Sequence, residues 1–166
     1  EHTAVWQSML GISWFWAMGV VWMAYIPPFV ADTLKAGSGV ATQLLMMFSI
    51  GIGAGSYLSS KLLHGEISAK YAPLAGGGIS ICSMLFIIAE SMTSVEPFTV
   101  LSLKGILIMI SLVGIGACGG IFSVPLYAIL QGKSEATHRA RNIAANNILN
   151  SFFMGEQRGP YIGFLN

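Results

Sequence analysis

Charged residues are scarce in this sequence, where they make up 9% of the 166 residues. Soluble domains carry about 25% charged residues, so this chain lacks the polar side chains that would cover a globular surface. Hydrophobic residues make up 54% of it. The net charge of +1 gives no basis for binding nucleic acid, because phosphate recognition needs a clear excess of lysine and arginine. The composition therefore predicts an integral membrane protein.

Side chains that carry chemistry are also few. Cys82 and Cys118 both fall within apolar runs, so we interpret them as small packing residues and not as a disulfide framework or metal site. The three histidines, His2, His64 and His138, have no partner at metal-ligand spacing. Neither a nucleophile–base pair nor a pair of carboxylates is evident. The sequence predicts no enzyme activity, no metal and no cofactor.

Long apolar runs are what the sequence does contain. A membrane-spanning helix needs about 20 apolar residues, and four continuous runs satisfy that requirement. They cover about residues 9–30, 40–63, 72–90 and 105–130, and an incomplete fifth covers 142–154. A closed β-barrel would instead need short alternating segments. The predicted fold class is all-α integral membrane.

Two of these runs contain residues that disturb helices. Pro27 and Pro28 are expected to end the first run, because proline supplies no backbone donor. The fourth run is longer than a core of about 30 Å requires, so we expect it to tilt or bend. The residues that offer a place to bend are Gly116, Gly119, Gly120 and Pro125.

The chain is interpreted as an internal fragment. It starts at Glu1 without methionine, and no basic segment precedes its first apolar run. The apolar pattern stops after Met154, at a stretch beginning Gly155-Glu156. We expect residues 1–154 to form one transmembrane unit and residues 155–166 to be an atypical tail.

Basic residues are divided unequally between the loops on the two sides. One side holds Lys61, Lys70, Lys133, Arg139 and Arg141, and the other holds Lys35 and Lys104. The positive-inside rule places the first side in the cytoplasm. Arg139 and Arg141 either only fix this topology or also contact anionic lipid headgroups. Near the outer interface, Asp32, Glu90 and Lys104 are expected to be solvated or to snorkel.

Small residues recur at helical spacing. Gly51 and Gly55 lie four residues apart, as do Gly116 and Gly120, and each pair lies on one helix face. Small residues at this spacing let two helices approach closely. Both pairs are predicted to serve helix packing, together with Pro125, and a surface that slides during transport is the alternative.

Asparagines form a polar stripe on the last apolar run. Asn142, Asn146 and Asn150 recur every four residues, and amides are costly in hydrocarbon unless they have partners. The stripe should therefore face other helices or line a substrate path, and Asn142 could serve only as a helix cap. Asn146 and Asn150 are the substrate-path candidates, and Gln43 is a weaker candidate of the same kind.

Two stretches near the end of the chain resemble a known group of transporters. The sequence GGIFSVPLYAILQ, residues 119–131, resembles the tenth helix of lysophospholipid transporters in the major facilitator superfamily. The sequence HRARNIAANNILN, residues 138–150, resembles the next loop and helix, in the version fused to an acyltransferase and an acyl-carrier-protein synthetase. Residues 40–63, with a glycine-rich end before Lys61, resemble the eighth helix. The resemblance extends from about Trp6 to Met154.

The resemblance implies a twelve-helix transporter of the bacterial inner membrane, built from two six-helix halves. This chain would supply helices seven to ten and part of eleven. Such proteins move lysophospholipid, notably lysophosphatidylethanolamine, across the membrane for reacylation. The implied partners are membrane lipids, the missing N-terminal half, and a fused or separate acyltransferase. Because alternating access needs both halves, the fragment alone is not expected to transport.

Other functions remain open at the level of sequence. One is a facilitator for a different solute, such as a drug or sugar. Another is a membrane anchor for a fused acyltransferase. A third is a helical bundle that packs in a similar way without transporting anything.

Overall fold

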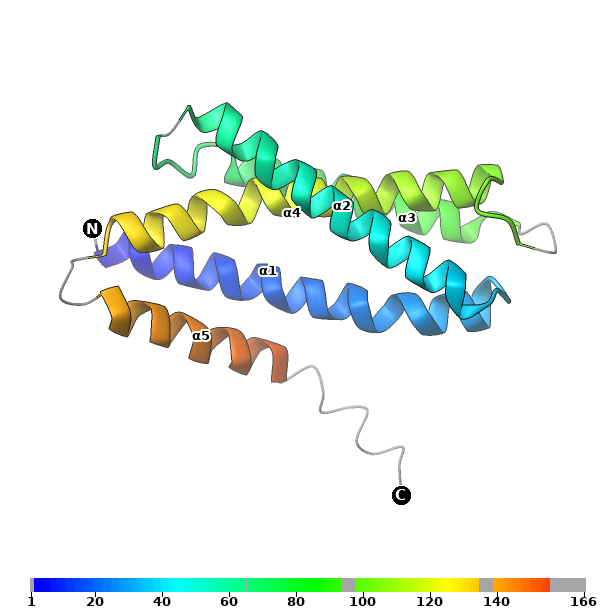
Figure 1. Cartoon of the computed structure of the whole chain (residues 1–166), viewed down its shortest axis with the longest axis horizontal. Helices are drawn as coiled ribbons and strands as arrows, with labels where there is room; N and C mark the ends of the chain where they lie inside the picture. The colour runs from blue at the N-terminus through cyan, green and yellow to red at the C-terminus, as the bar shows by residue number, and fades with distance from the viewer. Residues whose placement is uncertain (1, 65, 94–97, 135–138, 156–166) are drawn as a thin grey trace, which may run out of the picture.

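The computed structural model describes residues 2–64, 66–93, 98–134 and 139–155 (Figure 1). These residues form helices and loops without a β-strand. The elements are α1 (His2–Pro28), the π-helical turn η1 (Phe29–Thr33), α2 (Ser38–Leu63), α3 (Ala72–Ser91), α4 (Leu103–Gly132) and α5 (Arg139–Gly155). Four stretches are long and apolar enough to span a membrane, namely α1 with η1, α2, α3 and α4. The all-α integral membrane fold is thus confirmed. Of the predicted tail, only Gly155 lies within the described residues.

Helix α1 begins at His2, earlier than the expected start near Met9. Its first turns carry polar residues, so the hydropathy pattern does not predict this part of the helix. They are nevertheless packed, because Val5 and Met9 form a buried cluster with Leu126 and Leu130 of α4. Burial against a neighbouring helix explains why the helix extends beyond its apolar run.

The α-helix ends at Pro28, as the Pro27-Pro28 pair predicted, but the helical path continues beyond it. Both prolines lie inside α1, and Pro28 has helical backbone angles, with φ −65° and ψ −36°. The chain continues directly into η1, which is closed by a hydrogen bond from Leu34 N to Phe29 O of 3.2 Å. Prolines cost backbone donors but do not force a helix to stop, particularly near its end. The wider π turn then directs Phe29 and Val30 into the core.

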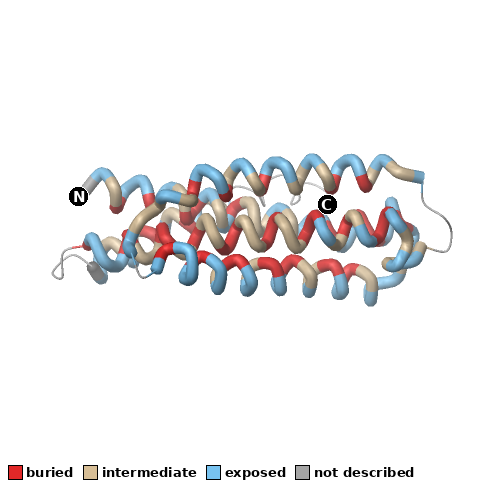
Figure 2. Tube along the Cα trace, turned by 90° about the horizontal axis from the view of Figure 1, so that it is seen from above, coloured by how far each residue is buried: buried red, intermediate tan, exposed pale blue. Residues whose placement is uncertain are grey.

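Helix α4 lies at the centre of the bundle. It packs most extensively against α2 and α3, and α1 covers another of its sides. Consecutive spans run in opposite directions, and α5 lies alongside α1 at the edge of the molecule (Figure 1). Buried positions form stripes facing the interior, and the outer faces are exposed (Figure 2). Because these outer faces carry large apolar side chains such as Leu74, Ile81 and Ile110, they are suited to contact lipid.

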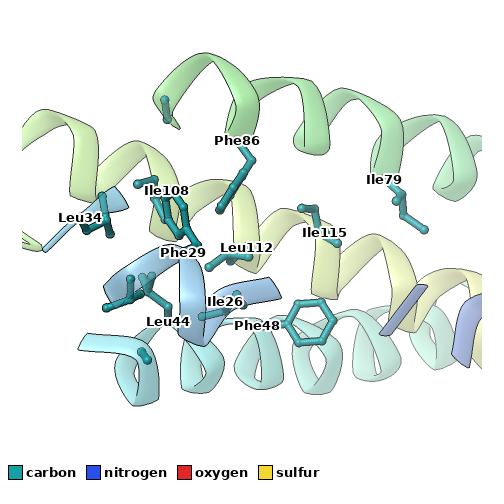
Figure 3. Packing of buried hydrophobic residues seen from close by; sticks show 13 residues of the cluster. Ile26, Phe29, Leu34, Leu44, Phe48, Ile79, Phe86, Ile108, Leu112 and Ile115 are labelled. Atoms are coloured by element: carbon teal, nitrogen blue, oxygen red, sulfur yellow. The ribbon is translucent and has the colours of Figure 1, made fainter. Parts of the chain in front are cut away.

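Two buried clusters hold the helices together. The larger joins the end of α1 and η1 to α2, α3 and α4, with Phe48 and Phe86 reaching toward the isoleucine-rich face of α4 (Figure 3). The smaller joins the first half of α1 to the last turns of α4, and Leu149 of α5 packs against it. Packing from both clusters fixes α1 along most of its length.

Helices α2 and α4 approach so closely that the glycines at their contact cannot carry side chains. A methyl group on Gly120 would lie 2.5 Å from Ile52 O, and one on Gly116 would lie 2.9 Å from Ile52 N. Facing them, methyl groups on Gly51 and Gly55 would overlap the backbone of α4. The two glycine pairs therefore pack against each other. Pro125 is also buried in α4, which continues through it as a helix.

The two cysteines pack against glycines where α3 meets α4. A methyl group on Gly114 would lie 2.5 Å from Cys82 Sγ, and one on Gly78 would lie 2.6 Å from Cys118 Sγ. Both thiols are free. The packing role interpreted from the sequence is confirmed, and α4 uses different small residues toward α2 and α3.

Candidate functional site

A cleft with a volume of about 280 Å³ lies between α1 and α3. On each helix the lining residues are three or four positions apart and therefore lie on one face. The lining residues are Met18, Val21, Trp22 and Tyr25 of α1, and Ser83, Phe86, Ile87 and Glu90 of α3. The cleft is apolar along most of its length and ends at a carboxylate.

Aromatic rings close one end of this cleft. The Phe86 ring lies 5.0 Å from that of Trp22 and 6.2 Å from that of Tyr25, measured between centroids, and both contacts are edge-to-face. Behind it, Phe29 lies 5.3 Å from Phe86. Such pairs contribute about 0.5–1.5 kcal/mol each beyond the area they bury. We refer to Trp22, Tyr25 and Phe86 as the aromatic wall.

The carboxylate of Glu90 is fixed by the aromatic wall. The Tyr25 hydroxyl donates a hydrogen bond of 2.8 Å to Glu90 Oε1. Glu90 is partly buried near the C-terminal end of α3. The side chain was expected to be solvated or to snorkel, and it is partly exposed but also has a partner within the protein. Two elements position it, since α3 supplies the backbone and α1 supplies the donor.

Lys104 was also expected to be solvated or to snorkel, and the structure places it inside the protein. Only 5% of its surface is exposed. Its ammonium donates to the carbonyl of Glu90 over 2.9 Å and to that of Met92 over 2.8 Å. The last carbonyls of a helix lack partners within the helix, and a cation at this end is favourable. Lys104 thus caps α3 from the first turn of α4. Asp32 is exposed, as expected.

The indole of Trp22 carries an unusual polar group. Its Nε1 is buried and has no hydrogen-bond partner among the residues that the structure describes. Buried donors in proteins are nearly always paired. Trp22 belongs to the aromatic wall, and its ring lines the cleft that contains Glu90.

The asparagine stripe lies at a different place, between α1 and α5. Asn150 is 8% exposed and accepts a hydrogen bond of 2.8 Å from the Ser13 hydroxyl. Asn146 is 1% exposed, and its Oδ1 has no partner within the described part of the chain. Ser8 is also buried on α1. We refer to Ser13, Asn146 and Asn150 as the polar α1–α5 interface.

The other predicted residues lie outside both groups. Asn142 donates from Nδ2 to Ser134 Oγ over 3.0 Å, which ties the start of α5 to the end of α4. Gln43 is exposed on α2. Arg141 is exposed near the start of α5, and the side chain of Arg139 lies outside the described residues. The structure does not bring Gln43 together with the asparagines.

Sequence reasoning missed the aromatic wall. Trp22 and Tyr25 belong to a run that reads as uniformly apolar, and Phe86 is one apolar residue among many on α3. One signal was available in the sequence of α3. Glu90 lies one helical turn after Phe86, and a carboxylate is uncommon within a membrane span. The partner helix, however, could not be identified from one sequence.

Curated relatives are similar in sequence to most of this chain. It is 31% identical over 146 residues to the lysophospholipid transporter LplT of Klebsiella pneumoniae (strain 342), which covers 85% of the chain and 32% of the relative. It is 29% identical over 143 residues to that of Pectobacterium carotovorum, with the same coverage. It is 29% identical over 154 residues to that of Escherichia coli O157:H7, covering 88% of the chain and 35% of the relative. The chain therefore spans about a third of the length of these relatives. No family model matches it, and no solved structure matches it.

Proposed function

Because this chain is related to the lysophospholipid transporters over most of its length, we propose that it forms part of a transporter that moves lysophospholipid across the bacterial inner membrane for reacylation. The observation that carries the proposal is the similarity itself, which covers at least 85% of the chain in each relative compared. The four candidate spans support it, since a lipid transporter must be embedded in the bilayer. The spans are connected by short loops, as expected of a multi-pass protein.

We further propose that the transporter has the major-facilitator architecture. In that arrangement α1 to α4 would be helices seven to ten, and α5 would be the first part of helix eleven. Alternating access requires a second half that rocks against this one. The proposed partners are therefore an N-terminal half, the surrounding lipids, and an acyltransferase that consumes the lysolipid, either fused or separate.

The test uses the full-length protein, expressed in a bacterial strain that lacks its own lysolipid transporter. Uptake of headgroup-labelled lysophosphatidylethanolamine into spheroplasts is measured against cells that carry an empty vector. Uptake above that background supports the proposal. Absence of lysolipid uptake, combined with uptake of a sugar or export of a drug, would assign the protein to a different solute. Acylation that persists without any lysolipid movement would indicate a membrane anchor.

A further inference from the structure

We infer that the cleft between α1 and α3 binds the ammonium group of an amine-bearing lysophospholipid headgroup, with Glu90 as its counter-ion and the aromatic wall as its cation–π partner. This inference rests on the proposed function, because it assigns a headgroup site within the same transporter. It concerns which lysolipids are favoured and not whether lysolipids are moved.

Charge is the first reason. Glu90 is the charged residue among those that line the cleft. Tyr25 occupies one position on Oε1, and a carboxylate offers about four acceptor positions in all. Lys104 donates to the backbone carbonyls of Glu90 and Met92. The carboxylate can therefore accept hydrogen bonds from a further cation.

The aromatic wall is the second reason. Trp22, Tyr25 and Phe86 line the same cleft as Glu90, and their rings lie 5.0 to 6.3 Å apart. An ammonium group is attracted to aromatic faces, most strongly to tryptophan, and more so where water is excluded. Rings combined with a carboxylate distinguish a zwitterionic headgroup that carries an ammonium group from a purely anionic headgroup, which the carboxylate would repel.

The apolar part of the cleft suits the remainder of such a lipid. Met18, Val21 and Ile87 line it away from the carboxylate. Val21 is 40% exposed and Ile87 is 55% exposed, so the cleft is open on its outer side. Its volume of about 280 Å³ is close to the lower limit of about 300 Å³ for ligand pockets. A headgroup together with the beginning of one acyl chain is an appropriate occupant.

The experiment compares two lysolipids that share the same acyl chain. The full-length protein is expressed with Glu90→Gln, which keeps an oxygen acceptor for Tyr25 but removes the charge. Uptake of lysophosphatidylethanolamine and of lysophosphatidylglycerol is measured, each normalised to folded protein in the membrane. We expect the ratio of the two uptakes to fall about tenfold, because one ammonium–carboxylate contact is lost. Glu66→Gln is the matched control, since Glu66 is exposed outside the cleft, and it should leave the ratio unchanged.

An unchanged ratio in folded Glu90→Gln would overturn the inference. If Glu90→Gln does not fold, the ratio is measured for Trp22→Leu, which removes the strongest cation–π partner of the aromatic wall and keeps the carboxylate. A ratio that is unchanged in that variant overturns the inference equally. A wild-type protein that moves neither lysolipid refutes the proposed function, whereas movement of both with an unchanged ratio refutes only the headgroup site.

Discussion

The Ser13 hydroxyl donates a hydrogen bond to Asn150 Oδ1 over 2.8 Å, although 137 positions separate the two residues in the sequence. Both side chains are buried, with Ser13 completely covered. The bond connects α5, which is too short to be among the candidate spans, to the first span. Neither lipid nor water competes for these groups. The polar α1–α5 interface therefore fixes the orientation of α5 about its own axis.

Removing either partner of this bond should have nearly the same effect. Ser13→Ala, Asn150→Leu and the double variant are expected to lower the free energy of unfolding by similar, modest amounts. Interhelical hydrogen bonds in membranes contribute about 0.6 kcal/mol, and up to about 2 kcal/mol in model peptides. Unfolding of the purified full-length protein in mixed detergent micelles measures this. Additive losses in the double variant would show that the two residues act independently.

Asn146 should behave differently, because its Oδ1 is buried without a partner in the described structure. Asn146→Leu is expected to leave the amount of folded protein near that of wild type and to reduce lysolipid uptake per folded molecule. The exposed neighbour, Asn147→Leu, is the control. Uptake is normalised to protein recovered from the membrane. Wild-type uptake for Asn146→Leu would mean that this amide serves packing alone.

Because α2 packs closely on α4, the effect of a larger side chain on folding should depend on which glycine it replaces. Gly55→Leu and Gly120→Leu should sharply lower the yield of folded protein, because their side chains would overlap backbone atoms of the facing helix. Gly53→Leu should be tolerated, since a methyl group there meets nothing within 4 Å. Size-exclusion chromatography of detergent extracts gives the comparison. Equal yields for Gly53→Leu and Gly55→Leu would contradict the close approach.

The cap that Lys104 places on α3 should contribute to stability. Lys104→Met keeps the apolar stem but removes the donor to two helix-end carbonyls. Hydrogen bonds to a charged group contribute about 1.5–3 kcal/mol, so we expect a clear fall in Tm. Lys35→Met, at an exposed site on the same side of the bundle, should change Tm little. Similar values for the two variants would show that the cap is unimportant.

Topology can be tested with single cysteines. Lys70 and Gly37 are exposed at opposite ends of the bundle. In a background with Cys82→Ala and Cys118→Ala, Lys70→Cys should react with an impermeant maleimide from the cytoplasmic side. Gly37→Cys should react from the outer side. Labelling of both from one side would invalidate the four-span arrangement.

The sequence alone was sufficient to predict the spans and the fold class. Whether a segment crosses a bilayer depends on its own length and hydropathy, and a single sequence contains both. The predicted starts of α2, α3 and α4 lie within two residues of those observed. At α1, the polar first turns misled the pattern, because there the packing of Val5 and Met9 outweighs local preference.

Only the tertiary structure could decide which helix faces meet. A helix that is apolar on all sides has no polar face to indicate its orientation, so nothing in the α1 or α3 sequence assigns Tyr25 to Glu90, which lies 65 positions away. For the same reason the burial of Lys104 could not be foreseen. Its position near a span end is typical of a solvated lysine, and only the arrival of the α3 C-terminus beside it supplies the carbonyls that make burial favourable. Hydropathy determines that a segment enters the membrane, whereas side-chain contacts between helices determine where its polar groups find partners.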